Sequence, residues 1–141
     1  MIREAREKDV EGLAELMGDL GYPTESSEME NRMYTIFSKN DYKTYVYEED
    51  GNLHGMIGMI LCHRFEKSES YIRIIAFVVK SEFRGNGIGS KLLNAAENWA
   101  KQKGANMMTL NSGNRSERKE SHQYYLRKGF EGSATGFYKQ I

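Results

Sequence analysis

The segment FRGNGIGSKLL, residues 83–93, joins an apolar run to an amphipathic one through three glycines. The apolar run, YIRIIAFVVK at residues 71–80, is the richest in β-branched and aromatic side chains, and its part IIAFVV, residues 74–79, has no polar alternation, which predicts a central strand covered on both faces. After the glycines, apolar residues recur at helical spacing as far as Gly104. A strand, glycine loop and helix in this order aim free backbone N–H groups and the positive end of the helix dipole at one point, which favours binding of phosphate.

Several ligands compete for such a loop. The dinucleotide fingerprint fails because Ser90 stands where its last glycine is required. The nucleoside triphosphate loop fails because it needs lysine before serine or threonine, whereas Ser90 precedes Lys91. The loop by itself therefore leaves two alternatives, the pyrophosphate of coenzyme A and a tight turn that binds nothing.

The composition limits the class of protein. The 141 residues are the size of about one domain, and we predict a single domain over residues 1–141. Twenty basic and twenty acidic residues give a formal charge of zero, so no broad basic field is available to hold nucleic acid or an anionic membrane. No apolar run approaches the ~18–20 residues that span a bilayer. We expect a soluble, cytoplasmic protein without a nucleic-acid or membrane partner. The single cysteine, Cys62, excludes an internal disulfide and a metal site built from several cysteines, and we expect no metal.

Hydrophobic spacing and turn residues predict the other elements. The apolar stripe from Val10 to Leu20 predicts a helix, and Ser27 with Glu30 forms a candidate capping box for a second one. Further predictions are strands at 2–7, on both sides of the turn at 50–52, and at 106–113, a helix at 116–128, and two closing strands within 130–141. This order predicts an α+β domain with a mixed sheet.

Two motifs resemble the GNAT superfamily of acyl-CoA-dependent N-acetyltransferases. Its signature is Arg or Gln, two residues, Gly, one residue, then Gly or Ala at a helix start, which Arg84, Gly87 and Gly89 match. The segment HQYYLRKGF, residues 122–130, resembles the family's closing motif, in which an aromatic pair is followed by three residues and Gly-Phe. Between them lies NSGN, residues 111–114, where the family often carries an Asn. The resemblance covers nearly the whole chain in element order.

The resemblance implies a GNAT-like fold, with a central mixed, mostly antiparallel sheet flanked by helices. Its parallel fourth and fifth strands splay apart, and the pantetheine arm of acetyl-CoA, the acetyl donor, would fill the gap because exposed backbone groups there need partners. By residue-by-residue transfer, the cofactor contacts are Phe77, Val78, Val79, Arg84, Gly85, Asn86, Gly87, Ile88, Gly89, Ser90, Asn111 and Ser121. For Arg84, a charge on the pyrophosphate and a solvated turn residue are alternatives.

The implied chemistry is attack of a neutral amine on a thioester carbonyl. Tyr125 matches the position that often protonates the departing thiolate, and a tyrosine, with an ordinary pKa of ~10, is protonated at neutral pH. A backbone N–H of Val78 or Val79 would polarise the carbonyl. Core packing is the alternative role for Tyr125 and the favoured role for Tyr124. Many relatives carry a Glu where this chain has Ile75, so the general base is missing from its usual place.

The second substrate is the least defined part of the prediction. The amine proton would leave through a water chain or to Glu28 or Glu30. The acceptor is expected under the loop between the first two helices, with contacts from Tyr22 and Tyr34. Acidic residues at 48–50 would suit a cationic acceptor.

The sequence thus predicts an N-acetyltransferase that acts on a primary amine of a small molecule, such as an aminoglycoside-like or polyamine-like cation. Acetylation of a protein N-terminus or lysine is one alternative. A catalytically silent acyl-CoA-binding or sensing module is another, because the strand carboxylate is absent. The expected partners are acetyl-CoA and a small amine, and a homodimer is left open because relatives are often dimers.

Overall fold

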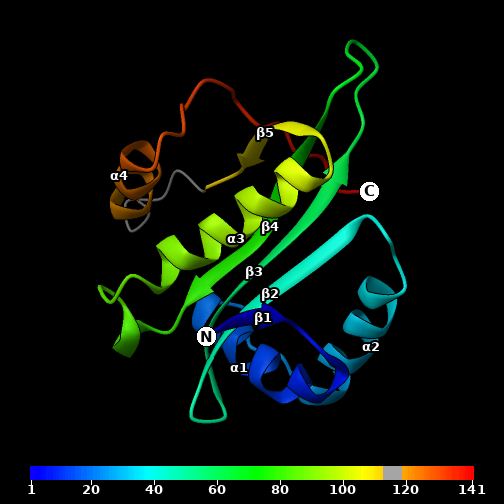
Figure 1. Ribbon diagram of the computed structural model, residues 1–141. Coiled ribbons are helices and arrows are strands. Elements are labelled where there is room, and N and C mark those ends of the chain that lie inside the picture. Colours follow the sequence, from blue (N-terminus) through cyan, green and yellow to red (C-terminus); the bar gives the residue numbers. More distant parts are fainter. Residues whose placement is uncertain (113–118) are drawn as a thin grey trace.

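The computed structural model in Figure 1 describes residues 1–112 and 119–141. Its elements are β1 (Ile2–Glu4), η1 (Glu7–Asp9), α1 (Val10–Leu20), α2 (Ser26–Phe37), β2 (Tyr42–Glu49), β3 (Asn52–Cys62), β4 (Ser70–Val79), η2 (Ser81–Phe83), α3 (Ile88–Gln102), β5 (Ala105–Leu110) and α4 (Lys119–Arg127). Both η elements are single 3-10 turns. Within the described part, no helix is both long and apolar enough to cross a membrane.

The five strands form one mixed sheet in the order β1-β2-β3-β4-β5. Neighbouring strands are antiparallel except β4 and β5, which run parallel. The pairing of β4 with β5 ends at Ile74 opposite Leu110, so residues 75–79 of β4 have no partner in β5. The predicted mixed sheet with splayed fourth and fifth strands is therefore confirmed.

Two apolar cores lie on opposite faces of this sheet. Helix α3 crosses one face (Figure 1), and α1 and α2 pack on the other. The strands supply both because adjacent side chains alternate between faces: Met56 belongs to the core of α1 and α2, and Ile57 to the core of α3. Helix α3 buries Ile88, Leu92, Leu93, Ala96, Trp99 and Ala100. Helices α1 and α2 bury Leu13, Ala14, Leu16, Met29 and Met33.

A β-bulge interrupts β4 at Ile75. Gly58 of β3 pairs with Ala76 and Met59 pairs with Ile74, so Ile75 has no partner in β3. Ile72 and Ile74 belong to the core of α3, and Phe77 and Val79 pack against it, whereas Val78 and Ala76 lie with the core of α1 and α2. Arg73 is exposed and Ile75 is 48% exposed. Within the run IIAFVV, residues 76–79 therefore contact a core on each face as predicted, whereas Ile75 is uncovered, because α1 and α2 reach only the carboxyl half of the strand.

Two boundaries near the N-terminus also differ from the prediction. The first strand ends at Glu4 rather than at residue 7, because residue 7 begins the 3-10 turn η1. Helix α2 is capped by Glu25 and Glu28, with the Glu25 N–H donating to Glu28 Oε1 at 3.1 Å, and not by Ser27 and Glu30. The capping box thus lies two residues earlier because the helix itself begins at Ser26.

The C-terminal segment contains neither of the two predicted strands. In the described structure, residues 131–141 have no strand and all are exposed, including Phe137 and Tyr138. The glycines at 132 and 136 suggested a hairpin, but a strand pair needs a neighbour and a buried face to offset the conformational entropy of glycine. Of the predicted strand at 106–113 and helix at 116–128, residues 113 and 116–118 lie outside the described residues.

An ion-pair cluster fixes the N-terminal segment against β2. Arg3 donates to both carboxylate oxygens of Asp9 at 2.8 Å and to Glu48 at 2.7 Å. The side chains of Arg3 and Asp9 are 10% and 5% exposed. Burial by itself would raise the pKa of Asp9, but hydrogen bonds from Arg3 and from the Arg6 backbone outweigh it and lower that pKa below its ordinary value of 3.8.

We expect the free energy of unfolding to fall in acid partly through Asp9. A folded-state pKa below the unfolded one contributes stability that is complete above the unfolded value and is lost as pH falls through the folded value. Asp9→Asn should cost about 2 kcal/mol at pH 7, between the values for exposed and fully buried pairs. In urea unfolding, variant and wild type should differ at pH 7, and the difference should shrink as pH falls below 3.8 through the folded-state pKa of Asp9. A difference that stays constant as pH falls would contradict this role. Glu15→Gln, which breaks an exposed pair with Lys80, is the control and should change little.

Candidate functional site

The glycine loop, residues 84–90, follows η2 and opens α3. Gly85 and Gly87 adopt left-handed φ angles of +83° and +81°. The first hydrogen bond of the helix runs from the Lys91 N–H to the Gly87 carbonyl at 3.1 Å. The amides of residues 88–90 therefore have no intrahelical acceptor and lie at the positive end of a 15-residue helix. This is the geometry of an anion-binding helix N-terminus.

Contacts from the preceding turn hold the loop in place. Arg84 Nε donates to the Val79 carbonyl at 3.1 Å, and Asn86 Nδ2 donates to the Phe83 carbonyl at 3.2 Å. The Phe83 ring stacks on the imidazole of His54, with centroids 3.6 Å apart and planes 10° apart. Arg84 thus ties the loop to the end of β4 in addition to placing a positive charge beside it.

Gly89 has a different role from the two glycines before it. A Cβ atom at Gly89 would lie 2.8 Å from the Tyr124 hydroxyl and 3.5 Å from Phe77 Cζ. Its missing side chain lets α4 pack against the first turn of α3. The Tyr124 hydroxyl is buried there without a hydrogen-bond partner among the described residues. This position agrees with the packing role predicted for Tyr124.

Tyr125 lies beside the unpaired part of β4. Its ring is 6.3 Å from the Phe77 ring and 5.7 Å from that of Phe130, measured between centroids. Gly129, at a φ of +91°, ends α4, and the Phe130 N–H donates back to the Tyr125 carbonyl at 3.0 Å. The closing motif thus folds Phe130 against Tyr125 and presents this half-buried tyrosine to the splayed strand.

The open edge of β4 carries the main-chain groups of Phe77 and Val79. The Lys80 N–H donates to the His54 carbonyl, so the main-chain N–H of Lys80 points toward β3. The N–H and C=O groups of successive residues in a strand point to alternate sides. Those of Val78 therefore also point toward β3, whereas those of Phe77 and Val79 point to the side where β5 has diverged. Of the two predicted donors to the thioester carbonyl, only Val79 has its N–H on the open side.

The other predicted site residues are more scattered. Asn111 directly follows β5 and donates from Nδ2 to the Tyr138 hydroxyl at 2.7 Å. Ser121 lies four residues before Tyr125 on α4, on the same helix face. Tyr22 and Tyr34 are 62% and 80% exposed and line neither of the two cavities described next.

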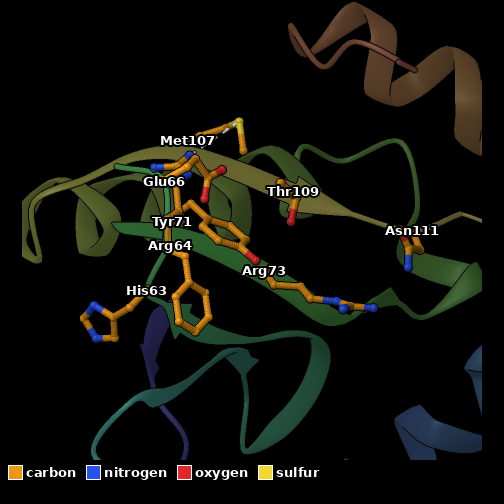
Figure 2. A pocket seen from close by; sticks show the side chains of 9 residues that line it. His63, Arg64, Glu66, Tyr71, Arg73, Met107, Thr109 and Asn111 are labelled. Atoms are coloured by element: carbon orange, nitrogen blue, oxygen red, sulfur yellow. Dashed lines mark hydrogen bonds between the residues drawn. The ribbon is translucent and has the colours of Figure 1, made fainter. Parts of the chain in front are cut away.

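Figure 2 shows a cavity of about 470 Å³ that the sequence did not predict. It lies over β4 and β5 on the face opposite α3. Its lining residues are His63, Arg64, Phe65, Glu66, Tyr71, Arg73, Met107, Thr109 and Asn111. The signal for it was strand alternation, since Tyr71 and Arg73 on β4 and Met107 and Thr109 on β5 are spaced two apart.

A second cavity, of about 830 Å³, lies between α1, the α1–α2 loop and the β2–β3 turn. It lies under the loop between the first two helices, where the acceptor was predicted, and Pro23 and Thr24 of that loop line it, but Tyr22, Tyr34 and the residues predicted for cofactor and catalysis do not. Over the described residues, no group of three or more His, Cys, Asp or Glu side chains is arranged to hold a metal ion. The splayed strands, the glycine loop and the smaller cavity therefore define the candidate site.

A sheet that splays beside an anion-binding helix N-terminus is the arrangement of an acyl-CoA-dependent acyltransferase. The family model "Acetyltransferase (GNAT) family" matches residues 10–130, and the chain belongs to this family. The aminoalkylphosphonate N-acetyltransferase of Salmonella typhimurium is 33% identical over 92 residues, which are 65% of this chain and 58% of that enzyme.

Two solved structures show the same fold. A GNAT family acetyltransferase from Staphylococcus aureus has a TM-score of 0.86 and 33% identity, covering 100% of this chain and 98% of its own. An aminoglycoside N-acetyltransferase in complex with CoA has a TM-score of 0.87 at 18% identity, covering 100% of this chain and 93% of its own, which shows likeness of fold alone.

Proposed function

We propose that the protein transfers an acetyl group from acetyl-CoA to a primary amine of a small molecule, by direct attack of the amine on the thioester. The observation that supports this most is the position of Tyr125 beside Phe77, on the part of β4 that has lost β5 as its neighbour. An enzyme of this type needs a phosphate cradle, an open strand edge and a proton donor close together. Here Gly89 of the glycine loop, Phe77 of the open strand and the Tyr124–Tyr125 pair are neighbours.

The cofactor would bind along the open edge. Its pyrophosphate accepts hydrogen bonds from the amides of residues 87–90, and its pantetheine amides pair with the main chain of Phe77 and Val79, as an added strand does. Membership of the family and the CoA complex of the aminoglycoside enzyme support this assignment.

The reaction itself would use few side chains. The amine attacks the thioester carbonyl, and the negative charge on the carbonyl oxygen is stabilised by a main-chain N–H on the open edge of β4 that pantetheine leaves free. The tetrahedral intermediate collapses by breaking the carbon–sulfur bond, and Tyr125 donates its proton to the departing thiolate. The products are the acetylated amine and CoA with a free thiol.

The proton of the attacking ammonium would leave through water. Ile75 occupies the strand position where many relatives carry a carboxylate, and its side chain is 48% exposed on the sheet face opposite α3. Glu28 is engaged at the start of α2, where it accepts from the Glu25 N–H and pairs with Arg32 at 3.9 Å. Glu30, the other carboxylate named from the sequence, is exposed on α2 and lines neither cavity, so we take solvent as the acceptor of this proton.

The pH dependence of the rate tests this route. Without a base, kcat/KM should follow the fraction of neutral amine, rising about tenfold per pH unit from 6 to 8 for an amine whose pKa lies near 10. Ile75→Glu should flatten this slope by supplying a carboxylate. A wild-type profile that reaches a plateau below pH 8 would instead reveal a base within the chain.

Thiol release tests the function directly. Acetyl-CoA should bind in calorimetry, and free CoA should form when a reactive primary amine is added. The S. typhimurium relative is named for aminoalkylphosphonates, which carry primary amines, and this supports starting with small amines.

One second function has an observation in its favour. Ile75 in place of the strand carboxylate is what a catalytically silent acyl-CoA-binding or sensing module would show. Such a module would bind acetyl-CoA and release no thiol with any acceptor.

A further inference from the structure

Arg73 is an unpaired cation beside the candidate reaction centre. Its side chain is exposed and makes no hydrogen bond or ion pair with any residue that the structure describes. Other arginines have partners, as Arg3 has in Asp9 and Arg84 in the Val79 carbonyl. An arginine that lines a cavity without a partner is available to bind a ligand.

The place of Arg73 relates it to the thioester. Arg73 pairs with Thr109 across β4 and β5, one step before the last pair of the two strands. Figure 2 shows its side chain extended along the sheet toward Asn111, where β5 ends, with the Thr109 hydroxyl on the same side. The guanidinium therefore lies on the sheet face opposite α3, next to the point where β4 and β5 part.

Among the residues that the structure describes, the rest of the cavity does not neutralise this charge. Arg64 donates to neutral oxygens, the Glu69 carbonyl at 2.7 Å and Asn106 Oδ1 at 2.8 Å, so its own positive charge adds to the field. Glu66 is the one carboxylate among the described lining residues, and in Figure 2 it lies at the opposite end of the cavity from the Arg73 guanidinium.

Tyr71 adds a neutral hydroxyl to the cavity lining. A hydrogen bond with the Cys62 side chain is the largest cause that raises the pKa of the Tyr71 phenol above its ordinary value of 10.0, and nearby arginines lower it less. Its hydroxyl therefore keeps its proton at neutral pH. Figure 2 shows this hydroxyl directed toward the stem of Arg73.

Building on the proposed function, we propose that Arg73 selects the acceptor, and that the acceptor is a primary amine on a short chain that ends in an anionic oxyacid such as a phosphonate or carboxylate. The guanidinium binds two oxygens of the anion, with Thr109 as a neighbouring donor, and the amine extends toward the open edge of β4. The same charge disfavours polyamine-like and aminoglycoside-like acceptors, which would bring further cations against Arg73.

Four amines of similar length test the selection. Steady-state thiol release is compared for 2-aminoethylphosphonate, β-alanine, ethanolamine and 1,4-diaminobutane. We expect kcat/KM to be at least tenfold higher for one or both anionic amines than for ethanolamine, and lowest for the diamine, as a charge-assisted pair predicts. Comparing the first two shows which anion the site prefers. A wild-type preference for the diamine or for ethanolamine would overturn the proposal.

The variants assign the effect to Arg73. Arg73→Gln should abolish the advantage of the anionic amines over ethanolamine, whereas Arg73→Lys should keep part of it. Lys67→Gln removes the same charge from the β3–β4 turn outside the cavity and should change nothing. An equal loss for all four amines in Arg73→Gln would overturn the proposal. Unchanged calorimetric affinity for acetyl-CoA shows that each variant is folded.

A binding measurement separates this inference from the proposed function. In calorimetry with CoA-loaded protein, 2-aminoethylphosphonate or β-alanine should bind wild type, and at least tenfold more weakly Arg73→Gln. If no amine turns over, the transfer reaction is wrong, and this titration alone decides the role of Arg73. The proposed role of Arg73 would be overturned if neither 2-aminoethylphosphonate nor β-alanine binds the wild type, or if both bind the wild type and Arg73→Gln equally.

Discussion

Tyr125→Phe should lower kcat for thiol release on the order of 100-fold or more and leave the affinity for acetyl-CoA unchanged. The phenyl ring keeps the contacts with Phe77 and Phe130 at the splayed strand, so the shape of the site is retained. What is lost is the proton for the departing thiolate, and general acid catalysis contributes about 10²–10⁴-fold. Steady-state thiol release and calorimetry with acetyl-CoA measure the two quantities separately.

Tyr124→Phe is the matched control for this experiment. It removes the same atom from the adjacent residue, whose hydroxyl is buried against Gly89 without a described partner. Deleting an unsatisfied buried hydroxyl is expected to be neutral or stabilising. We therefore expect normal turnover and an equal or higher unfolding temperature for Tyr124→Phe. If Tyr125→Phe keeps full activity, Tyr125 is a packing residue and the proton comes from elsewhere.

Gly87→Ala should weaken acetyl-CoA binding on the order of 100-fold. Gly87 has a φ of +81°, and its position as the N-cap of α3 places a new Cβ among the amides that would hold the pyrophosphate. The loss of one or two charge-assisted hydrogen bonds, each about 1.5–3 kcal/mol, accounts for this factor. Calorimetric titration with acetyl-CoA measures the affinity, and CoA lacking the acetyl group should show the same loss.

Gly104→Ala separates backbone strain from ligand binding. Gly104 also has a left-handed φ, of +76°, with no atom within 4 Å of a new Cβ, but it lies after the other end of α3. Both variants should therefore lose a similar stability of about 1 kcal/mol in thermal unfolding. Only Gly87→Ala should lose affinity. Equal binding by the two variants would mean that the pyrophosphate is held elsewhere.

Much of the cofactor side of the site was readable from sequence because it consists of backbone. Glycines between an apolar strand and an amphipathic helix predict free amides at the helix start, and the structure has that loop at residues 84–90. The reason for each glycine was not readable in advance. Gly85 and Gly87 are required by left-handed backbone, whereas Gly89 is required by the nearness of Tyr124 from a distant helix.

The acceptor side could not be predicted in the same way. The run IIAFVV gives no sign that Ile75 is a bulge, because the bulge depends on the register of β4 with β3. Alternation at Tyr71 and Arg73 indicates a more polar face, but it does not show that α1 and α2 leave this face uncovered. The prediction of two closing strands within residues 130–141 was wrong for a related reason. Turn residues at 132 and 136 predicted a hairpin, but the segment found no buried face in the described structure.

The sequence by itself determined the element order as far as α4 and the position of the glycine loop, since these follow from local patterns of apolar spacing and glycine, and its two motifs carried the resemblance to the family. The tertiary structure alone decided which peptide groups of β4 have no partner in β5, that the rings of Tyr124 and Tyr125 both lie near Phe77, and where the Arg73 side chain lies. The physical reason is that these features depend on contacts between segments far apart in the chain, and a local pattern carries no information about the partner that arrives or fails to arrive.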